Sequence, residues 1–310
     1  MLKIKQIPGD FFVKELIKTE IKNQGKYKCY VLKKKNFTTL KAIEIISKRF
    51  NLNLKDIGYC GNKDKNAVTE QFISIRTNKN IIFNNKDIKL EFLGHLDNKI
   101  NLGDNEGNYF EITARNLDKK YNKINNIVNY FDDQRFSKNN ALIGKLLLKR
   151  EFKKICKILK INSMNEVNKK ILRFYLHSFQ SYLFNLAVSD YIKKYKNYKK
   201  IKYSLGELFF IDKYEKLKFP LISFDAKFSK KDKIYLKFLK KEDIKLGDFI
   251  IKQFPYLIEE TSYRDVFVKI KDFKILNYEE DELNPGKFKE NISFILPKGS
   301  YATMVIKQML

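Results

Sequence analysis

The sequence contains few of the residues that form metal sites and disulfide frameworks. Among its 310 residues there are three cysteines, Cys29, Cys60 and Cys156, and two histidines, His95 and His177. No two cysteines have the spacing of a zinc-ligand pair or of a redox motif. A sparse, odd number of cysteines is typical of a reducing compartment. We therefore expect no metal and a cytoplasmic protein.

Long apolar runs are also missing. The N-terminal segment MLKIKQIPGDFFVKE lacks the continuous apolar stretch of a signal peptide. A membrane-spanning helix needs about 20 consecutive apolar residues, and no segment of the chain provides them. These absences predict a protein that is neither exported nor embedded in a membrane.

Acidic residues are scarce beside basic ones. The chain has 63 Lys and Arg against 36 Asp and Glu, a formal net charge of +27. A hydrophobic content of 44% excludes disorder as a description of the whole chain. A field of this sign attracts polyanions, either nucleic acid or an anionic membrane surface. A biased gene composition would enrich Lys, but it would enrich Asp and Glu as well, so the excess favours a nucleic-acid partner.

The first hundred residues alternate strand-like and helix-like patterns. Residues 10–17 and 27–33 are rich in β-branched and aromatic types, which predicts two strands separated by a turn. Residues 38–50 carry a helical stripe with Thr38 or Thr39 available as N-cap. The stripe consists of Leu40, Ile43, Ile46 and Phe50. Further strands are expected at 68–76, 88–94, 108–115 and 292–296.

Residues 140–198 change register, because apolar side chains recur three and four positions apart. This spacing predicts two or three helices. A short C-terminal helix is expected after the turn at 297–299, with Ser300 as a candidate cap. At about 150 residues per domain, the length favours two domains.

The most informative segment is GYCGNKDKNAVTEQFISI, residues 58–75. Gly58 and Gly61 are expected to allow a tight loop between ordered elements. Asp64 lies between two lysines, which favour the ionised form of its carboxylate. On these residues alone Asp64 is either a nucleophile or acceptor, or simply a surface turn residue. Cys60 has no histidine base near it in the sequence and is interpreted as a small buried residue.

The same segment resembles the signature of the TruD family of tRNA pseudouridine synthases, in which Gly, Lys-Asp-Lys/Arg, Ala-Val-Thr and Gln occur in this order. Four further segments resemble the family in the right order along the chain. They are IKQIPGDFFVKE near the N-terminus, NYFDDQRF at 129–136, HSFQSYLFN at 177–185 and LPKGSYATMVIKQ at 296–308.

The resemblance implies both a reaction and a set of site residues. Pseudouridine formation breaks the N1–C1′ bond of a uridine and joins C5 to C1′, without cofactor or metal. By resemblance, Asp64 is the carboxylate that acts at the sugar, and Lys5 pairs with it. The implied contacts to the nucleotide are Phe11, Asn129, Phe131 and Tyr301, while Gln71, Gln134 and Arg135 are expected to give structural support.

Two positions depart from the family pattern. Asp132 and Ser137 stand where the family has glycine. Asp tolerates the left-handed conformation better than most residues, but a carboxylate near RNA is expected to repel phosphate. In the closing motif, Tyr301 stands where Phe is common, and its hydroxyl needs a partner.

The resemblance implies an α+β fold with a mixed, mainly antiparallel sheet. We expect a catalytic domain from residues 1–150 and 275–310, interrupted by an inserted TruD-type domain at 151–274, with RNA held between them. The implied function is isomerisation of uridine 13 of tRNA by a monomeric enzyme. The alternatives are a non-catalytic tRNA-binding or RNA-chaperone protein on the same fold, and a nuclease or glycosylase, although no second catalytic acid stands out for the latter.

Overall fold

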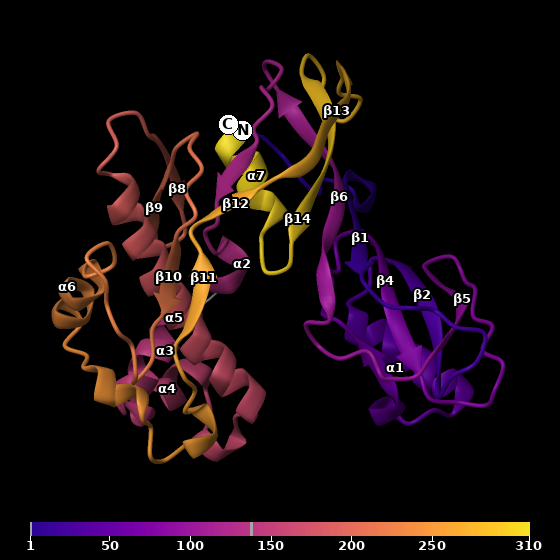
Figure 1. Cartoon of the computed structure of the whole chain (residues 1–310), viewed down its shortest axis with the longest axis horizontal. Coiled ribbons are helices and arrows are strands. Elements are labelled where there is room, and N and C mark those ends of the chain that lie inside the picture. Colours follow the sequence, from indigo (N-terminus) through magenta and orange to yellow (C-terminus); the bar gives the residue numbers. More distant parts are fainter. Residues whose placement is uncertain (1, 137–138) are drawn as a thin grey trace. The chain divides into compact units, whose positions relative to one another are not determined.

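The computed structural model describes residues 2–136 and 139–310, so Ser137 lies outside the described residues. The chain forms two compact units (Figure 1). Unit 1 takes the residues up to Asn125 together with Ile270–Ala302, and unit 2 takes Asn126–Lys269 together with Thr303–Gln308. The expected insertion at 151–274 stays a prediction. The contacts divide the chain at other positions, because the helix at 140–148 packs against the long helix that follows it.

Unit 1 is built on an eight-stranded sheet, in which seven strands run in the order β13-β14-β6-β1-β4-β2-β5 and β3 pairs with β4. The pair β1–β4 is parallel and the other pairs are antiparallel. The strands are β1 (Phe11–Ile17), β2 (Tyr27–Lys35), β3 (Ile57–Tyr59), β4 (Val68–Ile75), β5 (Ile88–Leu96), β6 (Asn105–Leu117), β13 (Lys271–Glu280) and β14 (Phe288–Pro297). The expected mixed, mainly antiparallel α+β fold is confirmed.

The strands predicted at 10–17 and 27–33 are confirmed, but the two do not pair with each other. β4 lies between β1 and β2 and hydrogen-bonds to both. Local periodicity identifies a strand, but it carries no information about which strand becomes its neighbour. The long-range pairing therefore had to come from the structure.

Helix α1 (Thr39–Phe50) packs on the face of the sheet formed by β2 and β4 (Figure 1). The Thr38 hydroxyl caps it by accepting from the Lys41 amide at 3.2 Å. Its buried face contains Ala42, Ile43 and Ile46. Leu40, expected in this stripe, is 50% exposed, so the predicted face was wrong at its first position.

Unit 2 is mainly helical and confirms the helices expected between 140 and 198. Its helices are α2 (Asp133–Phe136), α3 (Asn140–Leu148), α4 (Phe152–Leu159), α5 (Lys169–Ile192), α6 (Ile234–Lys241) and α7 (Ala302–Met309), of which Thr303–Gln308 belong to this unit. Its strand pairs are β7 (Asn126–Val128) with β12 (Phe267–Lys269), β8 (Lys199–Tyr203) with β9 (Gly206–Phe210), and β10 (Lys218–Leu221) with β11 (Ser262–Asp265). Helix α5 is the buried centre of the unit, contacting α3, α6, β9 and β10.

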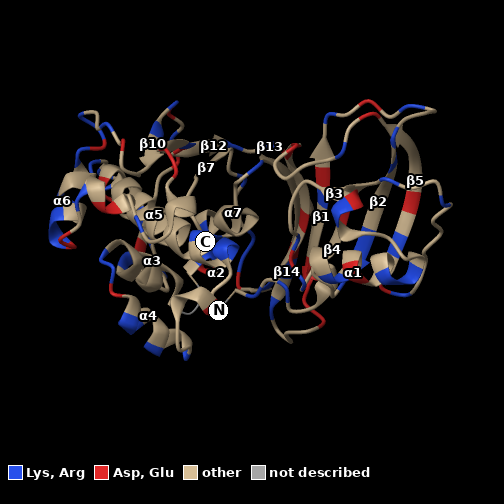
Figure 2. Cartoon of the chain, turned by 90° about the horizontal axis from the view of Figure 1, so that it is seen from below, with Lys and Arg blue, Asp and Glu red and all other residues tan. Residues whose placement is uncertain are grey.

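Basic residues are prominent on the short helices of unit 2. Figure 2 shows Lys and Arg in blue on α4 and α6, whose sequences are FKKICKIL and IYLKFLKK. Within the described part of the chain, no helix is long and apolar enough to cross a membrane.

Candidate functional site

Strand order brings together three segments that are far apart in the sequence. Because β1 and β4 are parallel neighbours, the residues that precede both strands lie at the same end of the sheet. These are Lys5–Asp10 before β1 and the loop 60–67 before β4. β2 runs antiparallel to β4 with Lys34 opposite Thr69, so β2 ends at this same place. The end of the sheet therefore holds Lys5, Lys34 and Asp64.

Asp64 and Lys5 form the ion pair that the resemblance implied. Lys5 Nζ lies 2.5 Å from Asp64 Oδ2 and 4.0 Å from the centre of the Phe11 ring. The Asp64 side chain is 42% exposed, whereas that of Lys5 is 15% exposed. The arrangement is an ionised carboxylate open to solvent, oriented by an ammonium that is itself packed on an aromatic ring.

The backbone at Lys5 is unusual. Lys5 has a φ of 60°, in the left-handed region, which costs a residue with a side chain about 1–2 kcal/mol. The segment before it is fixed by paired backbone hydrogen bonds between Lys3 and Arg115 on β6. The turn at Lys5 is thus held in a strained conformation that directs its side chain to Asp64.

The loop around Asp64 is supported by a buried hydrogen-bond network. Thr39, the first residue of α1, donates its hydroxyl to Gln71 Oε1 at 2.7 Å and accepts from the Lys63 amide at 2.9 Å. Gln71 Nε2 donates to the Gly61 carbonyl at 3.2 Å. Gln71, expected to give structural support, therefore connects the loop to α1 through β4.

Lys63 was expected to act on the Asp64 carboxylate, but its side chain points elsewhere. Its Nζ lies 2.5 Å from Glu15 Oε1 on β1, and the other oxygen of Glu15 accepts from the Phe72 amide at 3.1 Å. Both side chains are buried. This pair anchors the loop to the sheet, and the Asp64 ion pair is made with Lys5 instead.

Lys34 was not singled out from the sequence. It is 2% exposed, and its Nζ donates to the carbonyl oxygens of Phe37 at 2.6 Å and Asp64 at 3.0 Å. Burial lowers the pKa of Lys34 to about 8, with the Asp64 charge opposing that shift. The signal for it was present in the sequence, because alternation along β2 places Lys34 on the same face as Tyr30 and Leu32.

The neighbouring Cys60 and the loop glycines have structural roles. Cys60 is buried, and this burial, together with Glu15, raises the pKa of its thiol to about 12, which suits an inert core residue. Neither Gly58 nor Gly61 has a positive φ, so the expected reason for them is wrong. Gly58 is required by close packing instead, because a Cβ there would lie 2.2 Å from the Ile100 carbonyl oxygen.

In unit 2, Asn129 and Phe131 are both buried and share a partner that the sequence analysis missed. Arg264 on β11 donates to the Asn129 backbone oxygen at 3.0 Å and to its Oδ1 at 2.8 Å. The guanidinium carbon of Arg264 lies 4.1 Å from the centre of the Phe131 ring. Asn185 on α5 exchanges two hydrogen bonds of 2.9 Å with the Phe131 backbone. An arginine 133 or more positions downstream offers no local sequence signal for this role.

Asp132 does not behave as the sequence analysis expected. It is buried and lacks a positive φ, so it replaces the family glycine without left-handed strain. Its carboxylate contacts the Thr303 hydroxyl and lies 2.6 Å from Lys307 Nζ on α7. Lys307 also lies 2.8 Å from Asp133 Oδ2. A neutralised, buried carboxylate does not present a negative charge to solvent, so the expected repulsion of phosphate lacks a basis.

The last predicted residue, Tyr301, is half-buried and directly precedes α7. The neighbouring Ser300 was a candidate cap, but its buried hydroxyl makes no hydrogen bond to any residue that the structure describes. The capping prediction was therefore wrong. The structure brings Lys5, Phe11 and Asp64 together in unit 1, and Asn129 and Phe131 together in unit 2.

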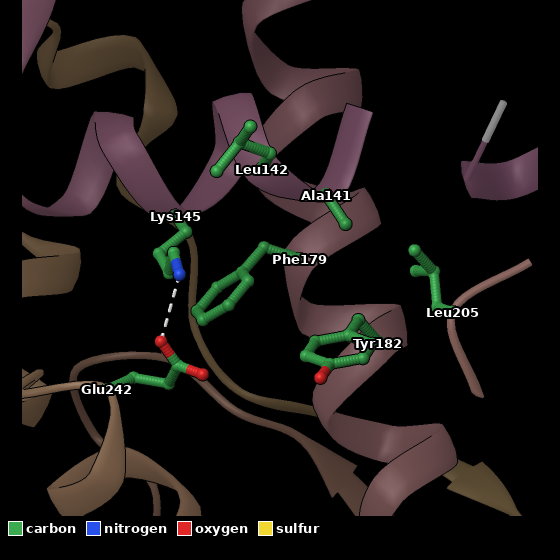
Figure 3. Close-up of a pocket in the computed structure, with 7 residues that line it drawn as sticks. All are labelled: Ala141, Leu142, Lys145, Phe179, Tyr182, Leu205 and Glu242. Atoms are coloured by element: carbon green, nitrogen blue, oxygen red, sulfur yellow. Dashed lines mark hydrogen bonds and ion pairs between the residues drawn. The ribbon is translucent and has the colours of Figure 1, made fainter. Parts of the chain in front are cut away.

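A small apolar pocket of about 160 Å³ lies between α3 and α5 (Figure 3). An ion pair of 3.0 Å between Lys145 and Glu242 borders it. None of the predicted site residues lines this pocket. Its lining residues are Ala141, Leu142, Lys145, Phe179, Tyr182, Leu205 and Glu242.

The chemistry available at the Asp64 loop is that of a single carboxylate. An ionised, half-exposed carboxylate beside an ammonium is suited to act as a nucleophile or as a base. Among residues 2–136 and 139–310, no three His, Cys, Asp or Glu side chains are grouped as metal ligands would be. The expectation that the site works without metal or cofactor stays a prediction.

Comparison with known proteins identifies one family. The model of the family "tRNA pseudouridine synthase D (TruD)" matches residues 2–165 and 210–309. A probable tRNA pseudouridine synthase D 1 of Methanococcus maripaludis is 29% identical, with 99% of each chain covered. A probable tRNA pseudouridine synthase D of Nanoarchaeum equitans is 31% identical, covering 99% of this chain and 98% of that one.

The fold has a counterpart among solved structures. The crystal structure of the putative tRNA pseudouridine synthase D of Methanosarcina mazei is similar with a TM-score of 0.72 at 23% identity. The similarity covers 99% of this chain and 93% of that one. It shows that the two chains share their fold over nearly their whole length.

Proposed function

Since the chain belongs to the tRNA pseudouridine synthase D family, we propose that it isomerises uridine 13 of tRNA to pseudouridine with Asp64 as the reacting carboxylate. One observation carries the proposal. The Asp64 carboxylate is the exposed member of an ion pair at the end of a rigid sheet, held by Lys5 at 2.5 Å. Such a group is ionised and accessible to a ribose.

The reaction rearranges one nucleotide without net gain or loss of atoms. The N1–C1′ bond of uridine breaks, the base turns within the site and C5 joins C1′. C5 then loses its proton to solvent, and N1 gains one proton from solvent. Asp64 either attacks C1′ or takes a proton from the sugar. Both routes need an unprotonated carboxylate, and Lys5 places a positive charge 2.5 Å from Asp64 Oδ2.

Lys5 acts as a positioning residue for this carboxylate. Its ammonium contacts both Asp64 Oδ2 and the Phe11 ring, so it fixes the orientation of the carboxylate. Water must be kept from C1′ during the reaction, because hydrolysis there leaves an abasic site. We propose that Phe11 and Tyr301 contact the uridine and contribute to this exclusion.

A uridine in a folded tRNA arm has to leave its stack before it can react, which costs a few kcal/mol. We propose that Asn129 and Phe131 bind the extruded nucleotide. Stacking of a base on an aromatic ring contributes about 1–3 kcal/mol. Arg264 and Arg135 both lie over the Phe131 ring, at 4.1 and 5.7 Å from its centre. A base that stacks on this ring therefore has to displace a guanidinium.

The positive charge supports an RNA substrate. Lysines at 193–202 and 227–245 are proposed to contact phosphates, since the β8–β9 hairpin and α6 carry exposed Lys side chains. Lys presents a point charge without the fork of Arg, which favours diffuse attraction to phosphate. Binding of tRNA should therefore weaken steeply as salt concentration rises.

The decisive experiment compares Asp64→Asn with Asp97→Asn on tRNA that has a uridine or a cytidine at position 13. Asp97 is a matched control, because it forms an exposed pair with Lys22 in the same unit. Wild type and Asp97→Asn should form pseudouridine at position 13 at the same rate. Asp64→Asn should lose activity by at least about 10²–10⁴-fold while it still binds tRNA.

Each other outcome has a distinct meaning. Full activity of Asp64→Asn contradicts the role of Asp64. Binding of tRNA without any pseudouridine formation by wild type supports the alternative of a non-catalytic RNA-binding protein. Pseudouridine formed on the tRNA with cytidine 13 contradicts the proposed position. We further propose that the enzyme is monomeric and cytoplasmic. Sedimentation of the active protein tests whether it is a monomer.

A further inference from the structure

Lys34 occupies a position where a charge is expensive. It is the last buried residue of β2 and follows Tyr30 and Leu32 on the face that packs against α1. Its strand partners at this level, Thr69 on β4 and Ile88 on β5, carry no charge. Isolated charges are rarely buried in such a layer without specific compensation.

The compensation that the structure provides is directed at the Asp64 loop. No carboxylate of the described residues lies within 4.0 Å of the Lys34 ammonium, which instead donates to two backbone carbonyls. One of these belongs to Asp64 itself, at 3.0 Å. The charged groups that act on Lys34 are Asp64, which favours its protonated form, and Lys63, which opposes it.

We propose that Lys34 is a second positioning residue for the Asp64 carboxylate, holding the main chain of Asp64 and supplying a positive charge from the core side of the loop. The proposal rests on the proposed function. Lys5 binds the Asp64 carboxylate directly. Lys34, which is buried, binds the backbone carbonyl of the same residue. An apolar residue at position 34 would fill the space but would bind neither carbonyl.

A pH effect follows from the burial of Lys34. Burial lowers its pKa from 10.5 to about 8, so its charge is present below pH 8 and is lost as pH rises through that value. In the unfolded chain Lys34 stays protonated up to its ordinary pKa of 10.5. Between pH 8 and that value the folded protein binds one proton fewer than the unfolded chain, so the free energy of unfolding rises with pH. Activity should therefore fall above pH 8 although the fold becomes no less stable.

The test follows single-turnover release of tritium from C5 of uridine in tRNA, because C5 loses its hydrogen when it joins C1′. Wild type, Lys34→Met, Lys34→Arg and Lys35→Met are compared from pH 6.5 to 9, with tRNA affinity and thermal unfolding measured in parallel. Lys35 is exposed on the same strand, and its side chain forms no hydrogen bond or ion pair with a described residue, so it is a matched control. It tests the loss of one Lys charge alone.

The expected result has three parts. Wild type and Lys35→Met lose rate above about pH 8. Lys34→Met is slower by at least about tenfold at pH 7, binds tRNA within about twofold of wild type and shows no alkaline decline. Lys34→Arg, whose charge does not titrate, recovers part of the rate and also lacks the decline.

Several results would overturn the proposal. They are a Lys34→Met rate near that of wild type, an alkaline decline that persists in this variant, or a wild-type rate that stays level to pH 9. The last needs no variant, so the proposal can fail even if Lys34→Met does not fold. Failure of the proposed function is distinguishable, because wild type itself would then release no tritium.

Discussion

The Asp64 loop and the segment Asn129–Phe136 differ in the exposure of their carboxylates. At the Asp64 loop the carboxylate proposed to react is 42% exposed, Lys5 binds it, and Lys34 binds the backbone of the same residue. In the second segment Asp132 is buried and neutralised by Lys307, and Arg264 covers the aromatic ring that was expected to meet a base. The first region exposes its carboxylate, and in the second the carboxylates of Asp132 and Asp133 are both paired with Lys307.

The difference shows that the same residue types serve different purposes according to exposure. The Asp64 carboxylate lies at the surface beside an ammonium, whereas the Asp132 carboxylate is bound by a hydroxyl and an ammonium in the interior. Losing a cation should therefore cost activity in the first region and folding free energy in the second. Three substitutions test this contrast.

Lys307→Met should give the largest effect, on stability. It leaves the buried Asp132 without its ammonium, which destabilises a fold by about 3–5 kcal/mol when a buried pair loses one partner. The free energy of unfolding in urea, followed by circular dichroism, measures this loss.

A double variant provides the control for Lys307→Met. Asp132→Gly restores the family residue and removes the stranded charge, so Asp132→Gly combined with Lys307→Met should be more stable than Lys307→Met alone. A double variant that is less stable than the single one would show that Asp132 is not the reason for the loss.

Lys5→Met should give the next largest effect, on rate with little change in stability. The Asp64 carboxylate loses a charge-assisted hydrogen bond of about 1.5–3 kcal/mol, which corresponds to a roughly tenfold to hundredfold slower single turnover. Lys22→Met, which breaks the exposed pair with Asp97, is the control and should leave the rate unchanged. Equal rates for the two variants would contradict the special role of the Lys5 pair.

Arg264→Met should give the smallest of the three effects. It leaves two oxygens of the buried Asn129 without their donor, at a cost of about 1–3 kcal/mol in unfolding free energy. The affinity for tRNA should fall together with the unfolding free energy. The single-turnover rate on tRNA that is already bound should stay closer to the wild-type rate. Arg264→Lys serves as comparison, because a single ammonium cannot reproduce both hydrogen bonds of the guanidinium. Unchanged stability and unchanged tRNA affinity would contradict the supporting role of Arg264 in this segment.

The sequence was sufficient for α1 and for several strands of unit 1, because these follow local patterns. Helix α1 begins at the predicted cap, and β4 follows the loop where alternation placed it. The family resemblance led to Lys5, 59 positions before Asp64. The two residues meet because β1 and β4 are parallel neighbours, a pairing that no local pattern encodes.

The other side-chain contacts could not be predicted, because they join residues that are distant in the sequence or on different elements. Lys63 is adjacent to Asp64 in the sequence, yet it binds Glu15 on β1. Arg264 and Lys307 act on residues more than a hundred positions earlier. Lys34 is different, because strict alternation along β2 already placed it on the buried face. Among the lysines of the chain, Lys34 is therefore one whose burial the strand pattern predicts.

The order in which the two units acquire their parts during synthesis follows from the sheet topology. Strand β14 pairs with both β6 and β13, and residues 303–308 of α7 complete unit 2. Both units therefore receive a structural piece from residues 288–309, which follow β6 and Asp132 by more than 150 positions. A polypeptide that stops before β14 would expose an unpaired edge on β6 and leave Asp132 without Lys307. Loss of residues 288–309 should therefore destabilise both units at once, although they form separate compact units.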